Sequence, residues 1–300
     1  MSKVLLVDAG QSGIKCEIWF DGELKEKHRL GPVFTNHPLA PQFLGVISQL
    51  AETAGDFDEI VISSSGVTNP HEVASATSAG LSSKTAIRVV HDSVGSLVVN
   101  CGLGTGVVCA AGTGIVTFSA SDSGTARVDG WGHSMGDFGS GFWIGKAGLE
   151  AAMKYFDGRG PKTSLLERLQ TRFGEPSAAY VAVQSDPAWV SVVASFAEVV
   201  LTESKSDEVS RRILVSAAAE IATSIRTSAI RTDIGTSSQF KVALVGQVFS
   251  NETLREEVKS RVREQYPECE FVGLVENLAA LRDLVTIKAG HPLFEYVGRS

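Results

Sequence analysis

The sequence predicts an α/β protein of two lobes, because buried strands alternate with amphipathic helices and a glycine-turned strand pair begins each half. Residues 3–7 are apolar, and residues 14–20 alternate like the hairpin partner of that strand. A second strand–turn–strand unit surrounds Gly112. We therefore expect two halves that meet at a cleft, with a seam near residues 118–122.

The remaining elements follow from local patterns in chain order. Asp21-Gly22 predicts a tight turn into a third strand at residues 24–29. Apolar residues at helical spacing predict a helix over residues 43–54. Further short strands are expected at residues 59–63, 86–90, 240–245 and 270–274. Further helices are expected at residues 93–100, 142–156, 165–173, 191–203, 209–231, 254–266 and 277–289.

The composition is that of an ordinary globular protein. The chain has 300 residues, of which 43% are hydrophobic and 20% charged, enough for one large core or two of domain size. Its net charge of −7 disfavours nucleic acid and anionic membranes as partners. The longest apolar stretches are shorter than the ~20 residues that a bilayer span needs.

The cysteines and the first residues indicate the compartment. Cys16, Cys101, Cys109 and Cys269 match no zinc or disulfide pattern, so we expect reduced thiols. The opening Met-Ser-Lys leads directly into a strand, without the apolar stretch of a signal peptide. We therefore expect a cytoplasmic protein.

Two glycine-rich turns predict a site for phosphate groups. The first, Asp8 to Lys15, has the form Asp-x-Gly-x-Ser-x-x-Lys, in which Gly10 and Ser12 can present N–H and hydroxyl donors. Asp8 can hold the hydrated Mg²⁺ that accompanies ATP, and Lys15 can pair with phosphate or lie on the surface. The second turn, Gly112-Thr113-Gly114, repeats this logic. Either turn alone can be an ordinary hairpin, but two together predict a phosphotransferase.

Three further positions carry possible chemistry. Asp92 follows an apolar strand, where a carboxylate suits a general base but can equally cap the next helix. Gly246-Gln247 follows another strand and leaves bare backbone against which a flat ring can lie. Residues 130–141 hold five glycines, which is typical of a loop shaped around a ligand. Within it, Trp131 can stack on a sugar or brace the loop.

These motifs, in this order, resemble the sugar-kinase branch of the actin-like ATPase superfamily, which has a ribonuclease H-like fold. They are most similar to N-acetylglucosamine kinases and their relatives in the BadF/BadG/BcrA/BcrD ATPase family. The resemblance covers nearly the whole chain and is carried by residues 8–13, 91–95, 112–114, 130–140 and 242–249. It implies a mixed sheet in each of two lobes with a central cleft between them. The expected N-terminal lobe is residues 1–118 with a C-terminal helix at about 284–300, and the other lobe is 119–283.

The resemblance also implies a role for each matched residue. Thr35-Asn36-His37 is similar to a sugar-binding loop, and Ser65-Gly66 to a second loop that borders the sugar. Asp92 would be the catalytic base, Asp8 the metal-binding residue, and the hexose pocket would be lined by Asn36, Ser65, Gly66, Trp131 and Asp137. The nucleotide would be bound by Gly10, Gln11, Ser12, Gly13, Lys15, Gly112, Thr113, Gly114, Gly246 and Gln247.

By this resemblance the protein would be a homodimeric kinase that uses ATP and Mg²⁺ to phosphorylate an amino sugar. The expected substrate is N-acetylglucosamine, phosphorylated at O6. The chain departs from the family pattern at three places. Ile115 stands where serine is usual, and Phe138 where glutamate often stands. The segment before the last helix, commonly glycine-rich in the family, reads Glu276-Asn277-Leu278-Ala279-Ala280. Two alternatives stay open. Cys109-Ala110-Ala111-Gly112-Thr113-Gly114 also resembles the iron–sulfur segment of ATP-driven activators of 2-hydroxyacyl-CoA dehydratases. A sugar sensor without catalysis is the other.

Overall fold

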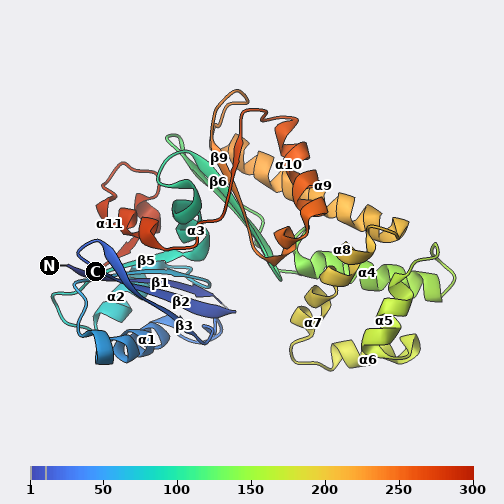
Figure 1. Ribbon diagram of the computed structural model, residues 1–300, viewed down its shortest axis with the longest axis horizontal. Coiled ribbons are helices and arrows are strands. Elements are labelled where there is room, and N and C mark those ends of the chain that lie inside the picture. Colours follow the sequence, from blue (N-terminus) through green and yellow to red (C-terminus); the bar gives the residue numbers. More distant parts are fainter. Residues whose placement is uncertain (1, 11) are drawn as a thin grey trace. The chain divides into compact units, whose positions relative to one another are not determined.

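The computed structural model describes residues 2–10 and 12–300, which form two compact units (Figure 1). Unit 1 comprises residues up to 106, 120–125 and 273–300, and unit 2 comprises 107–119 and 126–272. These boundaries differ from the expected lobes, which divided the chain at 118 and 284. Residues 107–119 lie in unit 2 because their strands join its sheet.

Unit 1 is built on a six-stranded mixed sheet in the order β11-β5-β4-β1-β2-β3. Its strands are β1 Lys3–Gly10, β2 Gly13–Phe20, β3 Glu23–Leu30, β4 Glu59–Ser64, β5 Ala86–His91 and β11 Gly298–Arg299. β1 runs antiparallel to β2 but parallel to β4, and β4 parallel to β5. The N-terminal part of the unit adds the helices α1 Leu39–Ala54, α2 Pro70–Ser78 and α3 Asp92–Cys101. α1 buries the apolar face at Phe43, Val46, Ile47 and Leu50 that its spacing predicted.

Unit 2 combines a five-stranded sheet, in the order β10-β9-β6-β7-β8, with a set of helices. Its strands are β6 Gly106–Ala111, β7 Ile115–Ser121, β8 Gly124–Val128, β9 Lys241–Val245 and β10 Glu270–Val272. Its α-helices are α4 Gly141–Phe156, α5 Leu165–Phe173, α6 Pro176–Gln184, α7 Trp189–Ser195, α8 Ala197–Glu203, α9 Glu208–Arg231 and α10 Glu252–Arg263, and η1 Gln247–Ser250 follows β9. Together the two sheets confirm the predicted α/β class.

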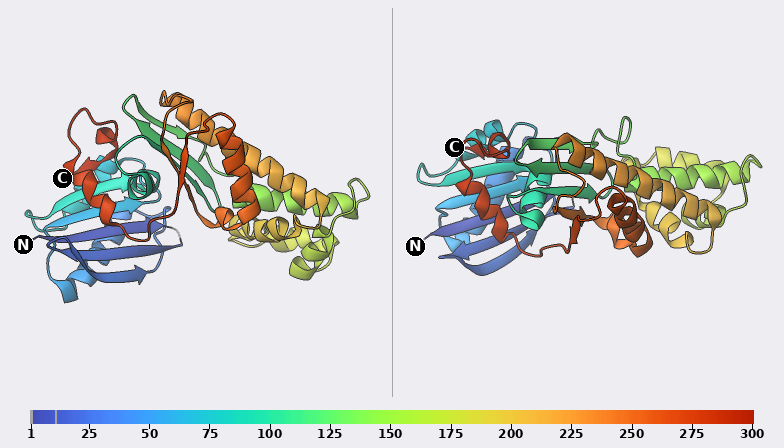
Figure 2. Two further views of the ribbon diagram at one scale, coloured as in Figure 1. Left: turned by 45° about the horizontal axis from the view of Figure 1, so that its top comes forward. Right: turned by 90° about the horizontal axis from the view of Figure 1, so that it is seen from above.

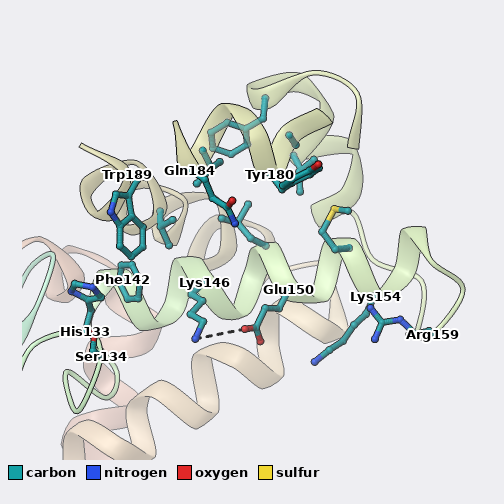
Figure 3. Close-up of a pocket in the computed structure, with 17 residues that line it drawn as sticks. His133, Ser134, Phe142, Lys146, Glu150, Lys154, Arg159, Tyr180, Gln184 and Trp189 are labelled. Atoms are coloured by element: carbon teal, nitrogen blue, oxygen red, sulfur yellow. Dashed lines mark ion pairs between the residues drawn. The ribbon is translucent and has the colours of Figure 1, made fainter. Parts of the chain in front are cut away.

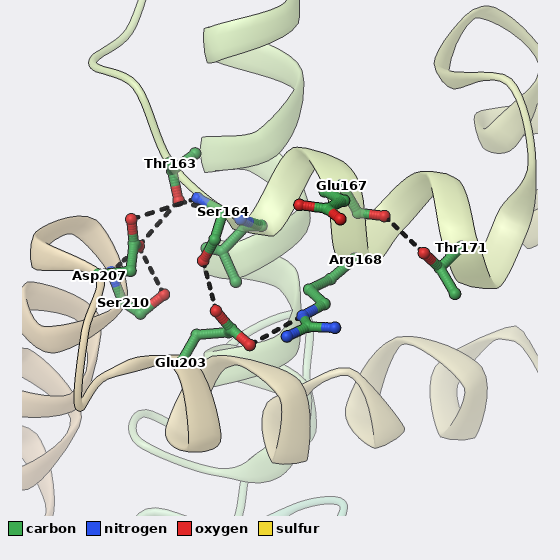
Figure 4. Close-up of polar contacts among 9 residues, drawn as sticks. Thr163, Ser164, Glu167, Arg168, Thr171, Glu203, Asp207 and Ser210 are labelled. Carbon is green, nitrogen blue, oxygen red and sulfur yellow. Dashed lines mark hydrogen bonds and ion pairs between the residues drawn. The ribbon is translucent and has the colours of Figure 1, made fainter.

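Polar side chains join α5 to the segment between α8 and α9 (Figure 4). Glu203 accepts hydrogen bonds from Ser164 Oγ at 2.6 Å and from Arg168 Nε at 2.8 Å. Asp207 caps α9 by accepting from the Ser210 backbone N–H at 2.9 Å, and it also accepts from Thr163 Oγ1 at 2.8 Å. The Asp207 carboxylate therefore caps the start of α9 and holds the segment that leads into α5.

The helix expected over residues 191–203 is interrupted in the structure. α7 ends at Ser195 and α8 begins at Ala197, and the Phe196 N–H donates to the Val193 carbonyl in a tightened turn. Phe196 is fully buried, and α4 approaches here so closely that a Cβ on Gly145 would lie 2.0 Å from the Val193 carbonyl oxygen. Tertiary packing therefore breaks a helix that is continuous in its apolar spacing.

The C-terminal helices expected at 277–289 and at about 284–300 are wrong. The segment instead contains the short turns η2 Ala279–Arg282 and η3 Phe294–Tyr296, with the four-residue helix α11 Asp283–Thr286 between them. Gly290 has a φ of 96° and Pro292 lacks an N–H donor, so a helix cannot continue through them. Figure 2 shows this red segment lying along the sheet of unit 1, where β11 pairs antiparallel with β5.

By length and composition α9 qualifies as a membrane span, contrary to the expectation that no stretch is long enough. Half of its 18-residue apolar window is buried inside the structure. Ile221, Ala222 and Ile225 are fully buried in the core of unit 2. α9 is therefore accounted for as a core helix.

Candidate active site

The candidate site residues of unit 1 lie where three parallel strands end. In the register of the sheet, Asp8 of β1 lies opposite Ser63 of β4, and Ser64 lies opposite His91 of β5. Asp92 follows directly, as the first residue of α3. The carboxyl edge of parallel strands is the usual place for a ligand in an open α/β sheet.

Asp92 is partly exposed, with 34% of its side chain accessible, and it has two polar neighbours. Ser65 Oγ donates to Asp92 Oδ2 at 2.6 Å, and His91 Nδ1 lies 2.8 Å from Oδ1. Burial opposes ionisation, but the contact with His91 and the hydrogen bonds from Ser65 and Ser93 outweigh it and lower the pKa of Asp92. Asp92 is not the helix cap, because His91 holds that position and Asp92 is the first residue of α3.

Asp8 forms a second carboxylate at this edge. Burial raises the pKa of Asp8, and the charge of Asp92 adds to this effect against the opposing charge of Lys15. Lys15, whose side chain is exposed, lies opposite Asp8 in the register of the β1–β2 hairpin. Asp8 and Asp92 therefore influence each other electrostatically, which is the situation that a divalent cation bound nearby would relieve.

The first phosphate turn and the predicted sugar loop of unit 1 lie against each other. The Val33 N–H donates to the Gly10 carbonyl at 3.1 Å. Gly10 and Gly13 flank the turn at the ends of β1 and β2, and Ser12 is exposed between them. Gln11 lies outside the described residues.

The segment that follows Val33 reaches the second predicted sugar loop. A Cβ on Gly66, whose φ is 79°, would lie 2.7 Å from Thr35 Cγ2, so only glycine allows this approach. Asn36 is exposed beside it. The fold thus brings residues 35–36 and 65–66 together, and Ser65 connects them to Asp92.

The second phosphate turn is supported by the start of α4. The Gly112 N–H closes the turn onto the Gly114 carbonyl at 2.9 Å. The N–H groups of Gly141 and Phe142 donate to the carbonyls of Gly112 and Thr113, at 2.8 and 3.0 Å. Thr113 is left exposed at the tip. Ile115, at the position where serine was noted as usual, is buried in the core and contributes no hydroxyl there.

The glycine loop after β8 is organised by two aspartates with positive φ, Asp129 at 61° and Asp137 at 60°. Asp129 accepts three backbone N–H groups, from Gly130, Asp137 and Phe138, at 2.7, 2.7 and 2.9 Å. Sequence reasoning missed Asp129. Its only local signal was an aspartate before glycine at the end of a strand, a common turn pair.

Asp137, the predicted sugar ligand, is buried against the second phosphate turn. Burial raises its pKa, although the N–H groups of Ile115 and Gly132 donate to its carboxylate and the nearby Asp129 charge adds to the rise. A Cβ on Gly114 would lie 2.7 Å from Asp137 Oδ2. Asp137 therefore contacts the turn directly as well as belonging to the glycine loop.

The other two predicted ligand segments of unit 2 are exposed. Trp131 is 58% exposed, and the Arg127 guanidinium lies 4.9 Å from the centre of its ring while donating to the Gly130 carbonyl. Gly246, with a φ of 106°, would place a Cβ 2.3 Å from the Ala111 carbonyl oxygen. Only glycine therefore lets this segment approach β6 beside the phosphate turn, and Gln247 is exposed next to it.

Cys109, in the segment that resembles the iron–sulfur activators, is fully buried, and burial raises the pKa of its thiol to about 12. Among residues 2–10 and 12–300, no group of three or more His, Cys, Asp or Glu side chains is placed to hold a metal ion.

A separate pocket of about 780 Å³ lies among the helices of unit 2 (Figure 3). Its walls include Leu149, Met153 and Phe173, with Lys146 and Glu150 forming an ion pair of 3.8 Å. His133 and Ser134 of the glycine loop border it, but its lining contains none of the residues predicted to bind nucleotide or sugar. Because its walls are mostly apolar, we assign it no part in the chemistry.

Comparison with known proteins places these observations in a family. The curated relatives include the N-acetylmuramic acid/N-acetylglucosamine kinase of Clostridium acetobutylicum, 32% identical over 183 residues that make up 58% of each chain. They also include the N-acetyl-D-glucosamine kinase of Dictyostelium discoideum, 30% identical over 177 residues, covering 56% of this chain and 54% of that one. The chain thus matches a little over half the length of these relatives.

Solved structures share the fold. A candidate N-acetylglucosamine kinase from Chromobacterium violaceum superposes with a TM-score of 0.73 at 21% identity, over 94% of this chain and 98% of that one. The ROK hexokinase from Thermus thermophilus has a TM-score of 0.53 at 15% identity, over 93% and 95%. These likenesses confirm the actin-like sugar-kinase fold. The model of the BadF/BadG/BcrA/BcrD ATPase family matches residues 39–275, and the chain therefore belongs to that family.

Proposed function

We propose that the protein is an ATP-dependent amino-sugar kinase that transfers the γ-phosphoryl group to O6 of N-acetylglucosamine. The observation that carries the proposal is Asp92, a partly exposed carboxylate at the carboxyl edge of the sheet with a lowered pKa. Membership of an ATPase family and similarity to curated N-acetylglucosamine kinases support it.

In the proposed reaction, Asp92 accepts the proton of the sugar hydroxyl while the hydroxyl oxygen attacks the γ-phosphorus. The new oxygen–phosphorus bond forms as the bond from the γ-phosphorus to the bridging oxygen breaks, and ADP leaves with that electron pair. The lowered pKa keeps Asp92 ionised at neutral pH, so the carboxylate is free to take the proton. Ser65, which donates to the same carboxylate, holds it in place.

The nucleotide is proposed to contact the two glycine turns. Gly10, Ser12 and Gly13 in unit 1, and Thr113 and Gly114 in unit 2, would present backbone N–H groups and hydroxyls of the kind that bind phosphate oxygens. Gly112, whose N–H closes the turn onto the Gly114 carbonyl, would shape that turn. Lys15 would add a positive charge, and Gly246-Gln247 would lie near the adenosine. Asp8 fits a water-bound Mg²⁺, because it is a partly buried carboxylate that repels Asp92. Bound Mg²⁺ would supply charge neutralisation at the phosphates.

The sugar is proposed to contact Asn36, Ser65, Gly66, Trp131 and Asp137. Exposed Asn36 offers an amide that can donate to and accept from sugar groups, and exposed Trp131 offers an aromatic surface against which the ring can pack. We further propose that the enzyme is a cytoplasmic homodimer. Oligomeric state is measured directly by light scattering coupled to size-exclusion chromatography.

The activity is tested by following ADP release with ATP, Mg²⁺ and a panel of N-acetylglucosamine, N-acetylmuramic acid, glucosamine, N-acetylmannosamine and no sugar. N-acetylmuramic acid belongs in the panel because the name of the Clostridium relative includes it. Release stimulated by N-acetylglucosamine supports the proposal. Sugar binding without ADP release identifies a sensor, and slow sugar-independent ATP hydrolysis by an iron-containing preparation identifies the activator.

The first prediction concerns the base itself. Asp92→Asn keeps the shape of the side chain but cannot accept the proton, so turnover should fall roughly 10²–10⁴-fold while sugar binding is largely kept. Asp56→Asn, on an exposed carboxylate of the same unit, is the matched control and should behave like the wild type. Steady-state ADP release and calorimetric sugar titration measure the two effects. Near-normal turnover in Asp92→Asn would refute the assignment.

A further inference from the structure

The carboxylate of Asp129 is the centre of the glycine loop, although the side chain is only 8% exposed and the sequence does not mark it. Its Oδ1 accepts from the N–H groups of Gly130 and Asp137, and its Oδ2 accepts from that of Phe138. Two of these donors lie eight and nine residues along the chain. One side chain thus closes the loop on itself, and charge-assisted hydrogen bonds of this kind are stronger than neutral ones.

The backbone around the Asp129 carboxylate leaves room for it only because glycine stands at a neighbouring position. A Cβ on Gly136 would lie 2.4 Å from Asp129 Oδ1, so glycine is required there. Gly130 has a φ of 78°, and Asp129 itself adopts the left-handed conformation that few residues other than glycine, asparagine and aspartate tolerate. Asp129 and Asp137 thus both hold a backbone conformation that is uncommon outside glycine, around one buried carboxylate, which indicates a function beyond closing a loop.

Asp137 carries the connection from this loop to the second phosphate turn. Its own N–H is held by Asp129, and its carboxylate accepts from the N–H groups of Gly132 and Ile115. Its Oδ2 packs against Gly114, which a Cβ at that position would block. The position of the Asp137 carboxylate, set by Asp129, therefore fixes the backbone at the end of the phosphate turn.

We propose that Asp129 is a positioning residue that acts through Asp137 to couple the Trp131 segment to the turn at residues 112–114. The inference rests on the proposed function, in which Trp131 contacts the sugar and the turn contacts the nucleotide phosphates. A sugar that orders residues 130–137 orders the turn through the same hydrogen bonds. Sugar binding therefore strengthens nucleotide binding, and by linkage the reverse also holds.

Asp129→Asn tests the coupling with little change of shape. The amide replaces one accepting oxygen with an NH₂ group, which cannot accept the N–H that faces it. Calorimetry measures the affinity for Mg²⁺ with a non-hydrolysable ATP analogue, with and without N-acetylglucosamine. In the wild type we expect the sugar to raise this affinity roughly fivefold or more, and in Asp129→Asn we expect the factor to approach one. The kcat should fall about tenfold or more.

Asp233→Asn is the matched control, because Asp233 is an exposed aspartate of unit 2 that also has a positive φ, of 54°. It should keep the wild-type coupling. Hydrogen exchange of the backbone amides provides a readout that does not need activity. In Asp129→Asn, exchange should become faster at residues 130–138 and also at residues 112–117. If exchange rises only at 130–138, or if the variant keeps the wild-type coupling factor, the inference is wrong.

The two proposals fail in different ways. If the wild type shows no sugar-dependent ADP release, the proposed function fails, while the exchange experiment still decides whether the loop and the turn are joined through Asp129. If Asp129→Asn does not fold, which thermal melting reveals, Asp137→Asn replaces it, because it leaves Asp129 in place and removes one of the two oxygens that accept the Ile115 and Gly132 N–H groups. Unchanged exchange at residues 112–117 in that variant overturns the inference.

Discussion

Two neighbours set the proton affinity of Asp92. His91 Nδ1 lies 2.8 Å from one carboxylate oxygen, and Ser65 Oγ donates to the other at 2.6 Å. Both favour the ionised form and oppose the effect of burial. A base held in this way is ready at neutral pH, and protonation at low pH disables it.

Removing His91 should therefore move the acid limb of the pH profile. In His91→Asn the asparagine can still cap α3, but the imidazole beside Asp92 is lost. The pKa of Asp92 then rises, and because the base must be ionised, kcat declines at a higher pH than in the wild type. The pH dependence of ADP release measures this shift. His71→Asn, on the exposed face of α2, is the control; an acid limb that stays in place or moves downward contradicts the assignment.

At this scale the sequence predicts some side chains and not others for a physical reason. Asp92 could be predicted as a functional residue because it follows an apolar strand. Whether it is a base or a helix cap could be decided only from the structure, in which His91 is the cap. Asp129 was not visible, because its donors come from Asp137 and Phe138, whose spacing follows no helical or strand period. The contact of Asp137 with Gly114 is likewise set by tertiary structure alone.

Among the elements, α9 depends on its first residues. Asp207 accepts from the Ser210 N–H, the Ser210 hydroxyl and Thr163 Oγ1, so one carboxylate caps α9 and ties it to the start of α5 (Figure 4). Burial opposes its ionisation, but these hydrogen bonds outweigh burial and lower the pKa of Asp207. A carboxylate with a lowered pKa stabilises the fold in its ionised form.

Asp207→Ala should therefore destabilise unit 2 by about 0.5–2 kcal/mol at neutral pH, the usual cost of losing an N-cap. Because the folded-state pKa lies below the ordinary value of 3.8, this stabilisation is complete above that value. It is lost as the pH falls through the folded-state pKa. Urea unfolding of the wild type and the variant across pH measures the difference. Glu198→Ala, on an exposed carboxylate of α8, is the control; a difference that persists unchanged in acid would contradict the account.

Element boundaries were predictable where local signals are strong. Residues 165–173 form a helix over the predicted range, and residues 209–231 form one that begins only a residue earlier. α2 was missed although Asn69 caps it and Pro70 begins it, a recognisable start signal. The break at Phe196 was not predictable, because it depends on Gly145 of another helix.

At the scale of the molecule, unit 1 is built from distant parts of the chain. The segment after residue 272 returns to it and buries four side chains with no exposed surface: Leu281, Leu284, Leu293 and Val297. Leu278 adds a backbone hydrogen bond to Glu17 Oε2 at 3.0 Å. Unit 2 has its own core, formed by different residues.

Deleting residues 273–300 should unfold unit 1 and leave unit 2 folded. Burial of the four side chains contributes roughly 6–12 kcal/mol, at about 1.5–3 kcal/mol each. That loss is comparable to the whole stability of a typical domain, about 5–15 kcal/mol. Hydrogen exchange followed by mass spectrometry checks each unit separately, so unit 2 serves as the internal control. Native protection of β1 and β4 in the truncated chain would contradict this expectation.

The return of the chain to unit 1 also governs the order in which a ribosome delivers the parts. In the sequence, unit 2 comes after β5 and before β11, the strand that pairs with β5. Translation, at about 5–20 residues per second, therefore completes unit 2 before β11 is made. Until residues 298–299 emerge, the outer edge of β5 has no β11 beside it, and an unpaired edge can recruit another nascent chain. Slow synthesis of residues 107–272 therefore prolongs the time during which the edge of β5 is unpaired and needs a chaperone to cover it.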